Sequence, residues 1–101
     1  MLTINDINNI EVDEDVSELD YYRSIQRAIN SGMWGLQGSY GRAMMDAITA
    51  GRCILGKTSA SDYYGNYIPS RDEVKEGTKG SITYVLECSG GDWLFEMENV
   101  A

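Results

Sequence analysis

The feature that most limits the fold is an amphipathic segment with its own start and stop signals, at residues 17–31. It opens with "SELD", a capping-box pattern in which Ser17 can accept a hydrogen bond from the amide of Asp20. Gly32 follows it, at a position where glycine commonly ends a helix. Its apolar residues recur at three- and four-residue steps: Val16, Leu19, Tyr22, Ile25 and Ile29. The pattern predicts a helix with one apolar face, which the rest of the chain must cover.

A second helix is predicted behind the glycine-rich stretch "GMWGLQGSYGR". Ser39 is placed to cap its start and Gly51 to end it. Its inner face is predicted to carry Tyr40, Ala43, Met44, Ala47 and Ile48. The residues that follow Gly51, "RCIL", are mostly apolar and predict a short buried strand.

The two ends of the chain alternate apolar and polar residues, as strands do. At the N-terminus Leu2 and Ile4 alternate, as do Ile10 and Val12, which favours extended structure, although Ile4 and Ile7 also fit a helical turn. Near the C-terminus "SITYVLEC" and "DWLFEME" each place alternate apolar residues on one face, and "SGGD" between them is a turn signal. We therefore expect a β-hairpin over residues 81–98.

Residues 56–80 are rich in Ser, Gly and Tyr and are expected to form a long loop over the core, with a short turn at 70–76. The whole chain, residues 1–101, is then expected to be one α+β domain. Two helices pack on a small, mainly antiparallel sheet that ends in the C-terminal β-hairpin. Its irregular parts are an acidic N-terminal segment, 1–16, and the loop 56–80.

The 101-residue chain is strongly acidic, with a formal net charge of −8. Residues 1–20 carry seven acids and residues 80–101 carry four, both without Lys or Arg, while the middle carries all eight bases against five acids. Nucleic acid and anionic membranes repel such a chain, so we expect partners with basic surfaces and no direct nucleic-acid or membrane binding. No apolar run is long enough to span a membrane and no signal peptide is recognisable, so a cytoplasmic location is expected.

Residue types that support catalysis or metal binding are scarce. The absence of histidine removes Ser–His and Cys–His nucleophile pairs, and two cysteines are too few for structural zinc. An active site built from Asp and Glu, or from Tyr and Arg, stays open. Cys53 and Cys88 are expected to be reduced and buried, and a disulfide between them requires that two strands bring them together. We expect no enzyme activity, no metal and no cofactor.

Residues 51–58, "GRCILGKT", match the spelling of the phosphate-binding P-loop. A P-loop lies between a buried strand and a helix, so that backbone amides and the helix dipole face the phosphates. Here a helix is predicted before the motif and a tyrosine-rich loop after it. The sequence therefore predicts a helix-ending glycine, a core strand and a turn, with Lys57 in solvent, in place of a nucleotide site.

The run "EVDEDVSELD" concentrates six carboxylates within residues 11–20. It is not an EF-hand loop, which needs Gly at its sixth position and Glu at its twelfth, where this chain has Glu18 and Ser24. Two interpretations remain: a solvated segment before the helix, or a negative patch that docks on a basic site as a charge mimic of DNA would. In the second, the partner-binding carboxylates are Glu11, Asp13, Glu14, Asp15 and Glu18.

The stretch "DYYGNYIPSR", residues 62–71, carries residue types that are favoured at binding surfaces. Tyr63, Tyr64, Tyr67 and Arg71 are predicted to contact a partner. The competing interpretation is that the tyrosines cover the sheet with their hydroxyls outward.

An alternative site for a small ligand lies at the start of the second predicted helix. Free backbone amides there could bind a phosphate or carboxylate, and an arginine stands beside them. The residues are Ser39, Tyr40, Gly41 and Arg42, with a phosphorylated metabolite or a nucleotide signal as the ligand. The competing interpretation is close backbone packing around Trp34, which the repeated glycines permit.

Two stretches, "WGLQGSYGRAMMDAI" (34–48) and "DYYGNYIPSRDEVKEGTKGS" (62–81), resemble small accessory proteins encoded by tailed bacteriophages. The resemblance covers roughly a third of the chain and implies neither an activity nor functional residues. It implies context, since small acidic phage proteins are often inhibitors of host enzymes or host defence, including anti-CRISPR proteins. The chain is accordingly expected to act in the host cytoplasm by blocking the basic surface of a host protein, such as a CRISPR or other nucleic-acid-binding defence protein. A self-assembling structural component is a third interpretation.

Overall fold

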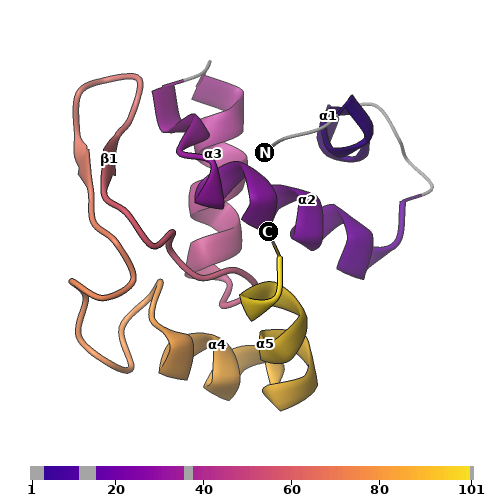
Figure 1. Ribbon diagram of the computed structural model, residues 1–101, viewed down its shortest axis with the longest axis vertical. Coiled ribbons are helices and arrows are strands. Elements are labelled where there is room, and N and C mark those ends of the chain that lie inside the picture. The colour runs from indigo at the N-terminus through magenta and orange to yellow at the C-terminus, as the bar shows by residue number, and fades with distance from the viewer. Residues whose placement is uncertain (1–3, 12–15, 36–37, 101) are drawn as a thin grey trace.

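The computed structural model describes residues 4–11, 16–35 and 38–100, and within them the chain is mainly helical (Figure 1). The elements are α1 (Ile4–Glu11), α2 (Glu18–Asn30), the 3-10 turn η1 (Met33–Gly35), α3 (Gly38–Thr49), β1 (Ala60–Ser61), β2 (Tyr67–Ile68), α4 (Ile82–Ser89) and α5 (Gly91–Glu98). In this part of the chain, β1 and β2 make a two-residue antiparallel ladder. The predicted α+β architecture, with two helices on an antiparallel sheet, is therefore wrong.

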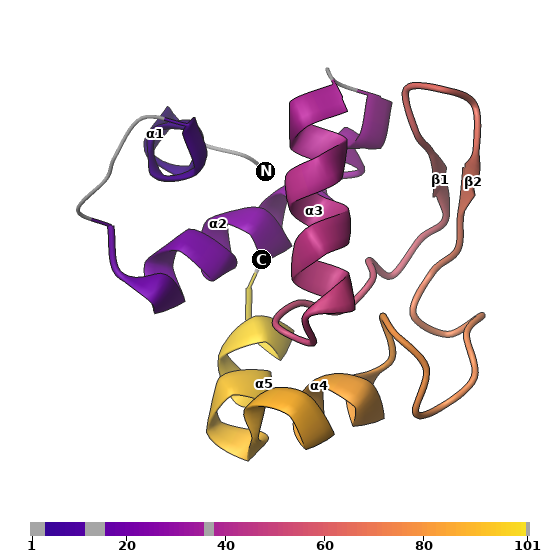
Figure 2. The ribbon, with the colours of Figure 1, turned by 180° about the vertical axis from the view of Figure 1, so that it is seen from behind.

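Helices α2 and α3 lie at the centre, and the other elements pack around them (Figures 1 and 2). Helix α1 lies against α2, and α4 and α5 form a helical hairpin whose second helix contacts α2. The β1–β2 hairpin lies beside α3, on the side away from α1, and contacts η1 through β1. The hairpin and the start of α3 are therefore neighbours, although they are far apart in the sequence.

Helix α2 begins and ends as its sequence predicts. The Ser17 side chain accepts a hydrogen bond from the amide of Asp20 at 3.1 Å. At the other end Gly32 has a φ of +70°, and its amide donates to the carbonyl of Ile29 at 3.0 Å. Ile25 and Ile29 lie in the core, so the predicted apolar face is the buried one.

Helix α3 is also present, but it begins at Gly38, so Ser39 belongs to its first turn and does not precede it as a cap. Its inner face is as predicted, with Met44 and Ile48 buried. Gly51 has a φ of +73° and donates its amide to the carbonyl of Ile48 at 3.1 Å. This left-handed glycine confirms the predicted end of the helix.

Residues 4–11 form helix α1, so the predicted extended structure is wrong there, and residues 1–3 and 12 lie outside the described part. The cause is a tertiary contact. The buried Asp6 carboxylate accepts a hydrogen bond from Ser24 Oγ at 2.9 Å and pairs with the Arg27 guanidinium, both on α2. A helix puts Asp6 on the same side as Ile10, which packs against the core. Buried charges must be paired, and this pair holds α1 on α2.

The segment "RCIL" is buried but is not a strand. Ile54 and Leu55 are almost inaccessible, yet no strand pairs with them anywhere in the described residues. The Gln26 side chain takes the place of a neighbouring strand: its Oε1 accepts from the Ile54 amide and its Nε2 donates to the Ile54 carbonyl, both at 2.8 Å. The predicted burial is confirmed, and the predicted strand is wrong because one side chain satisfies the backbone.

Residues 81–98 form helices α4 and α5, so the predicted β-hairpin is wrong. The Ser81 side chain caps α4 by accepting from the amide of Tyr84 at 3.2 Å. "SGGD" is a turn between helices: Gly90, with a φ of +90°, ends α4 and begins α5. Leu94 and Met97, three residues apart, are the buried positions of α5. The buried positions are therefore spaced as in a helix, although the apolar residues of this short segment also alternate as in a strand.

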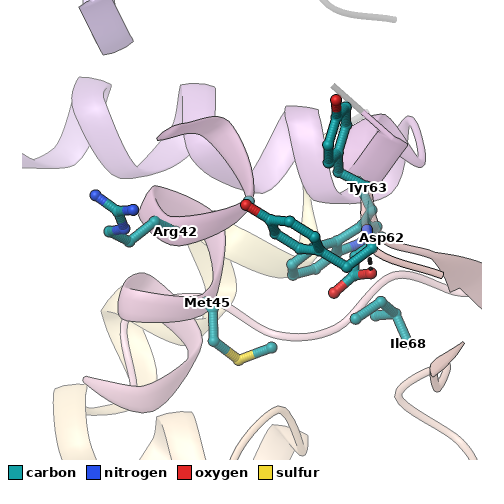
Figure 3. Close-up of a pocket in the computed structure, with 8 residues that line it drawn as sticks. Arg42, Met45, Asp62, Tyr63 and Ile68 are labelled. Atoms are coloured by element: carbon teal, nitrogen blue, oxygen red, sulfur yellow. Dashed lines mark hydrogen bonds between the residues drawn. The ribbon is translucent and has the colours of Figure 1, made fainter. Parts of the chain in front are cut away.

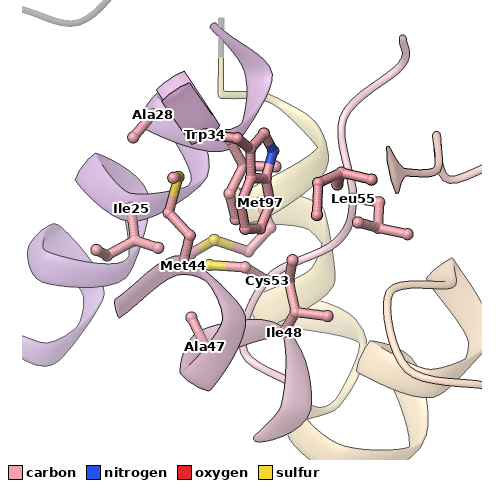
Figure 4. Packing of buried hydrophobic residues seen from close by; sticks show 11 residues of the cluster. Ile25, Ala28, Trp34, Met44, Ala47, Ile48, Cys53, Leu55 and Met97 are labelled. Atoms are coloured by element: carbon pink, nitrogen blue, oxygen red, sulfur yellow. The ribbon is translucent and has the colours of Figure 1, made fainter. Parts of the chain in front are cut away.

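The core lies where α2, η1, α3 and the segment after α3 meet (Figure 4). Its members are Ile25, Ala28, Ile29, Trp34, Met44, Ala47, Ile48, Cys53, Leu55, Ile68 and Met97. A smaller cluster of Ile54, Val85 and Leu94 fastens α4 and α5 to this core. Ile68 of β2 belongs to this core, which anchors the β1–β2 hairpin, and β1 is the strand that contacts η1.

Residues 56–80 hold little regular structure, as predicted, and a turn occupies residues 71–73 within the predicted 70–76. Gly80 pins the end of this segment, since its carbonyl accepts from the Leu55 amide at 3.1 Å. It has a φ of +91°, and a Cβ on it would lie 2.6 Å from Leu55 Cδ1. Only glycine fits this approach between the loop and the core.

Candidate functional site

Two regions that the sequence singled out separately meet in one pocket, between the start of α3 and the β1–β2 hairpin (Figure 3). We call it the hairpin pocket. It has a volume of about 230 Å³ and is lined by Trp34, Gly41, Arg42, Met45, Asp62, Tyr63, Tyr64 and Ile68. Figure 3 shows Arg42 at one end and Ile68 at the other. The alternative ligand site and the predicted tyrosine surface therefore share one cavity.

The loop between β1 and β2 is held in shape by one carboxylate. Asp62 Oδ1 accepts hydrogen bonds from the amides of Tyr64 at 2.9 Å and Asn66 at 2.8 Å, and Oδ2 accepts from Asn66 Nδ2 at 3.2 Å. Gly65 completes the turn with a φ of +83°. These hydrogen bonds stabilise the charged form and hold the pKa of Asp62 below its usual value. The bond from the Asn66 amide has the largest effect. Hydrogen bonds within the loop therefore hold its conformation without a binding partner.

Three tyrosines project from this hairpin. Tyr63, Tyr64 and Tyr67 are 63%, 76% and 62% exposed, so they do not cover a sheet. The rings of Tyr63 and Tyr64 meet edge to face, with centroids 5.2 Å apart. The Tyr67 hydroxyl donates to Glu73, whose second oxygen accepts from the Ser70 amide at 2.7 Å. These hydrogen bonds lower the pKa of Glu73, with the largest effect from the Ser70 amide. The bond from the Tyr67 hydroxyl also holds the Tyr67 ring in place.

A second pocket, of about 390 Å³, lies between α2 and α3 and shares Arg42 with the first. We call it the α2–α3 pocket; its other lining residues are Tyr21, Tyr22, Ala43, Asp46, Ala47 and Ala50. The Tyr21 and Tyr22 rings also meet edge to face, with centroids 5.1 Å apart. Burial, and then the neighbouring Tyr22, raise the pKa of Tyr21, so its phenol stays neutral. The exposed Arg42 thus belongs to two pockets, each with its own tyrosine pair.

Only part of the alternative ligand site reaches a pocket. Gly41 and Arg42 line the hairpin pocket, whereas Tyr40 is partly buried against the core. Ser39 is in the first turn of α3, and its side chain lies outside the described part. A Cβ on Gly35 or Gly41 would meet nothing within 4 Å, so close packing does not require glycine at these two positions.

The predicted carboxylate patch is described only at its edges. Glu11 ends α1, and Asp13, Glu14 and Asp15 lie outside the described residues. Glu18 begins α2, is exposed, and forms an ion pair of 3.0 Å with Arg52. An exposed pair of this kind is weak, which leaves Glu18 able to exchange Arg52 for another cation.

Arg71, predicted to contact a partner, is engaged within the chain. Its Nε donates to the Leu55 carbonyl at 2.8 Å, and its backbone amide donates to the Gly56 carbonyl at 2.9 Å. The side chain is half-buried, and this burial lowers the pKa of its guanidinium. Arg71 holds the loop against the core in this structure, while the tyrosines face solvent.

Residues 51–58 do not have the geometry of a P-loop. Gly51 ends a helix, and no helix begins until α4, with the whole intervening stretch described. Gly56 is packed on α2, since a Cβ there would lie 3.2 Å from the carbonyl oxygen of Ile29. Lys57 is exposed. The backbone amides of residues 51–58 are therefore not followed by the start of a helix, which a phosphate-binding P-loop requires.

The two thiols are free. Cys53 is buried as predicted, and burial raises the pKa of its thiol, whose Sγ donates to the Tyr22 carbonyl at 3.4 Å. Cys88 is exposed, so its predicted burial is wrong. It lies near the C-terminal end of α4, against Gly51. Across the described ranges, no three His, Cys, Asp or Glu side chains gather to hold a metal ion. None of the helices described is long and apolar enough to cross a membrane.

Comparisons of the chain with protein-family models, with curated protein sequences and with solved structures found no match. Function is therefore inferred from the geometry of the pockets and their charges.

The sequence did not place several of these residues at the site. A signal for the loop was present, since Asp62 followed by Gly65 and Asn66 is typical of a turn in which a carboxylate bonds backbone amides ahead of it. No signal marked the Tyr21–Tyr22 pair, because its neighbours in the pocket come from α3. What the arrangement offers is an aromatic, partly recessed surface around one arginine.

Proposed function

We propose that this chain is a non-enzymatic binding protein that docks on a protein partner through the surface around Arg42. This surface, the Arg42 surface, comprises the hairpin pocket, whose lining includes the exposed Tyr63 and Tyr64, and the α2–α3 pocket. Tyr67 is on the opposite face of β2 from Ile68 and would make a peripheral contact. The observation that carries the proposal is that exposed tyrosines on a loop ordered by its own hydrogen bonds line one pocket, and that Arg42 lines both this pocket and a second one. Tyr and Arg dominate the binding energy of many protein interfaces.

The size of the hairpin pocket supports a partner's side chain as its occupant. At about 230 Å³ it lies below the roughly 300–1,000 Å³ typical of small-molecule sites. Its lining is mainly aromatic and aliphatic, with Trp34, Met45 and Ile68 among the residues. An apolar side chain of the partner would enter this pocket, and Arg42 would donate hydrogen bonds to the partner's backbone carbonyls. The Asp62 hydrogen bonds reduce the loop entropy that binding must remove.

The chemistry of the partner follows from charge. A net charge of −8 supports a partner with a basic surface. Together with the resemblance to accessory proteins of tailed phages, this leads us to propose an inhibitor of a host protein, such as a nucleic-acid-binding defence protein of the CRISPR kind. In this proposal the carboxylates of residues 11–18 steer the encounter, and the Arg42 surface anchors the complex.

The test is capture from a bacterial host lysate, followed by affinity measurement with the captured protein. Three variants are compared with the wild type: Tyr63→Ser with Tyr64→Ser, Arg42→Ala, and the control Lys57→Ala. All four positions are exposed, so thermal unfolding should stay near that of the wild type. The first two variants should weaken binding by about 30-fold or more, as losses of about 2 kcal/mol imply, and the control should not. Equal binding by all would overturn the assignment of the Arg42 surface.

The steering role has its own measurement. Neutralising Asp13, Glu14, Asp15 and Glu18 together should slow association and flatten its dependence on salt, with little change in dissociation. If the association rate and its salt dependence are unchanged, the carboxylates have no part in binding.

A second candidate function is favoured by the position of Gly41 and Arg42 in the hairpin pocket. An anionic small molecule with an aromatic group could stack on the tyrosines and pair with Arg42. Native mass spectrometry of the protein purified from its host separates the two functions. A co-purifying small molecule that Arg42→Ala releases supports ligand binding, and a protein lost in the same variant supports the first proposal.

A further inference from the structure

The outer face of the α4–α5 helical hairpin carries an apolar stripe that is separate from the Arg42 surface. Ile82 and Leu86 are four residues apart on α4 and are 37% and 46% exposed. Phe95 on α5 is 65% exposed, although it is one of the largest apolar side chains in the chain. We call Ile82, Leu86 and Phe95 the apolar stripe.

The stripe is continuous across the turn between the helices. Leu86 Cδ1 lies 3.8 Å from the position that a Cβ on Gly91 would take. Gly91 and Phe95 are four residues apart on α5 and so lie on the same side of that helix. Ile82 and Leu86 are related in the same way on α4. The glycine therefore leaves a shallow place where the stripe passes from one helix to the other.

Acidic residues border the stripe. Asp92 and Glu98 lie three residues before and after Phe95, which makes both its neighbours on the helix surface, and both are exposed. Among the residues that the structure describes, Asp92 forms no ion pair, and Glu98 lies near enough to the half-buried Arg71 to interact with its charge without forming an ion pair. Residues 80–101 contain four acids and no Lys or Arg. An exposed apolar surface with exposed charges of one sign at its edge is typical of a docking site.

We propose that the apolar stripe docks a basic amphipathic helix of a protein partner. The helix would place its apolar residues between Leu86 and Phe95 and its Lys or Arg side chains against Asp92 and Glu98. Charge favours a basic occupant: a second copy would bring its own Asp92 and Glu98 to the interface, and an anionic membrane would repel both carboxylates. This inference does not depend on the function proposed for the Arg42 surface.

The test uses a synthetic amphipathic helical peptide of about 15 residues, with Leu along one face and Lys beside it, and a second peptide with Glu in place of Lys. Binding to the full chain is followed by fluorescence anisotropy and by shifts of backbone amide signals in NMR. The wild type should bind the Lys peptide, with shifts confined to α4 and α5, and should not bind the Glu peptide. High salt should weaken the complex.

Variants locate the interaction. Phe95→Ser should weaken binding of the Lys peptide by about tenfold or more, and Asp92→Asn with Glu98→Gln by about three- to tenfold at low salt. Tyr64→Ser, on the Arg42 surface, should leave it unchanged, so the two surfaces are told apart. The proposal is overturned if the wild type does not bind the Lys peptide, or if Phe95→Ser binds it equally well. It is also overturned if the free chain dimerises and Phe95→Ser abolishes the dimer, since a second copy would then cover the stripe.

Discussion

Replacing Gln26 with methionine should destabilise the protein strongly, because this side chain satisfies both backbone groups of a buried residue. Gln26 is inaccessible to solvent on α2, and its amide group bonds the Ile54 amide and carbonyl, each at 2.8 Å. It also donates to Asn30 Oδ1 at 3.0 Å. Methionine has nearly the same length, so the Gln26→Met variant removes the hydrogen bonds while it fills the same space.

The expected loss is a sizeable part of the total stability. A buried polar group left without a partner costs about 1–3 kcal/mol, so the two groups of Ile54 together cost about 2–6 kcal/mol. Burial of an apolar side chain in place of the amide offsets part of this, which leaves a net loss of about 2–4 kcal/mol. Single domains of about this length are stable by roughly 5–15 kcal/mol. The melting temperature should fall by about 8–30 °C.

Urea unfolding followed by circular dichroism measures the free energy directly. The Gln26→Glu variant is a matched control, since a protonated carboxyl can accept from the Ile54 amide and donate to its carbonyl, whereas an ionised one cannot donate. Burial raises the pKa of this carboxyl above the value of about 4.3 in the unfolded chain. Its contribution is therefore present at low pH and is lost as the pH rises through the folded-state pKa. A Gln26→Met variant within about 0.5 kcal/mol of the wild type would refute the reasoning.

Two further predictions concern the glycines and the tyrosine loop. Gly51→Ala should lower the free energy of unfolding in urea by about 2–5 kcal/mol, because the φ of Gly51 is positive and the new Cβ would lie 2.3 Å from Cys88 Cβ. Gly65→Ala is the matched control: its φ is also positive but its Cβ would lie in open space, so the loss should be about 1–2 kcal/mol. Equal losses would contradict the steric argument. The lowered pKa of Asp62 means that its loop bonds contribute stability above the unfolded-state pKa of about 3.9, which is lost as the pH falls through the folded-state pKa. The amide signal of Asn66 should titrate below that value in NMR and should stop titrating in Asp62→Asn; titration at the ordinary value would count against the loop geometry.

The sequence was sufficient for α2 and for the end of α3 because their signals are local. A cap such as Ser17 bonds an amide three residues away, and a terminal glycine such as Gly51 bonds within the last turn. The apolar faces of these helices repeat over several turns, so the helical period could not be confused with that of a strand. Such features depend on neighbours along the chain and are readable without the fold.

The errors arose where a short pattern fits two periods. "SITYVLEC" alternates like a strand over eight residues, yet Ile82 and Leu86 also lie on one side of a helix. Val85 settles the outcome, since it is the α4 residue that is buried, against Ile54 and Leu94. Likewise, α1 is explained by the burial of Asp6 on α2, a contact that the apolar residues around it do not reveal.

For the candidate site, the sequence by itself determined the residue types that are present: an acidic chain without histidine, a tyrosine-rich stretch, and an arginine after a glycine-rich stretch. It could not join Arg42 to Tyr63, about twenty residues away, or to Tyr21 on the preceding helix. Only the tertiary structure brought them together, because β1 contacts η1, Ile68 of β2 is buried in the core, and α2 packs against α3. Helix caps and helical periodicity depend on residues a few positions apart in the chain. Pockets form where segments that are distant in the sequence bury their apolar faces against each other.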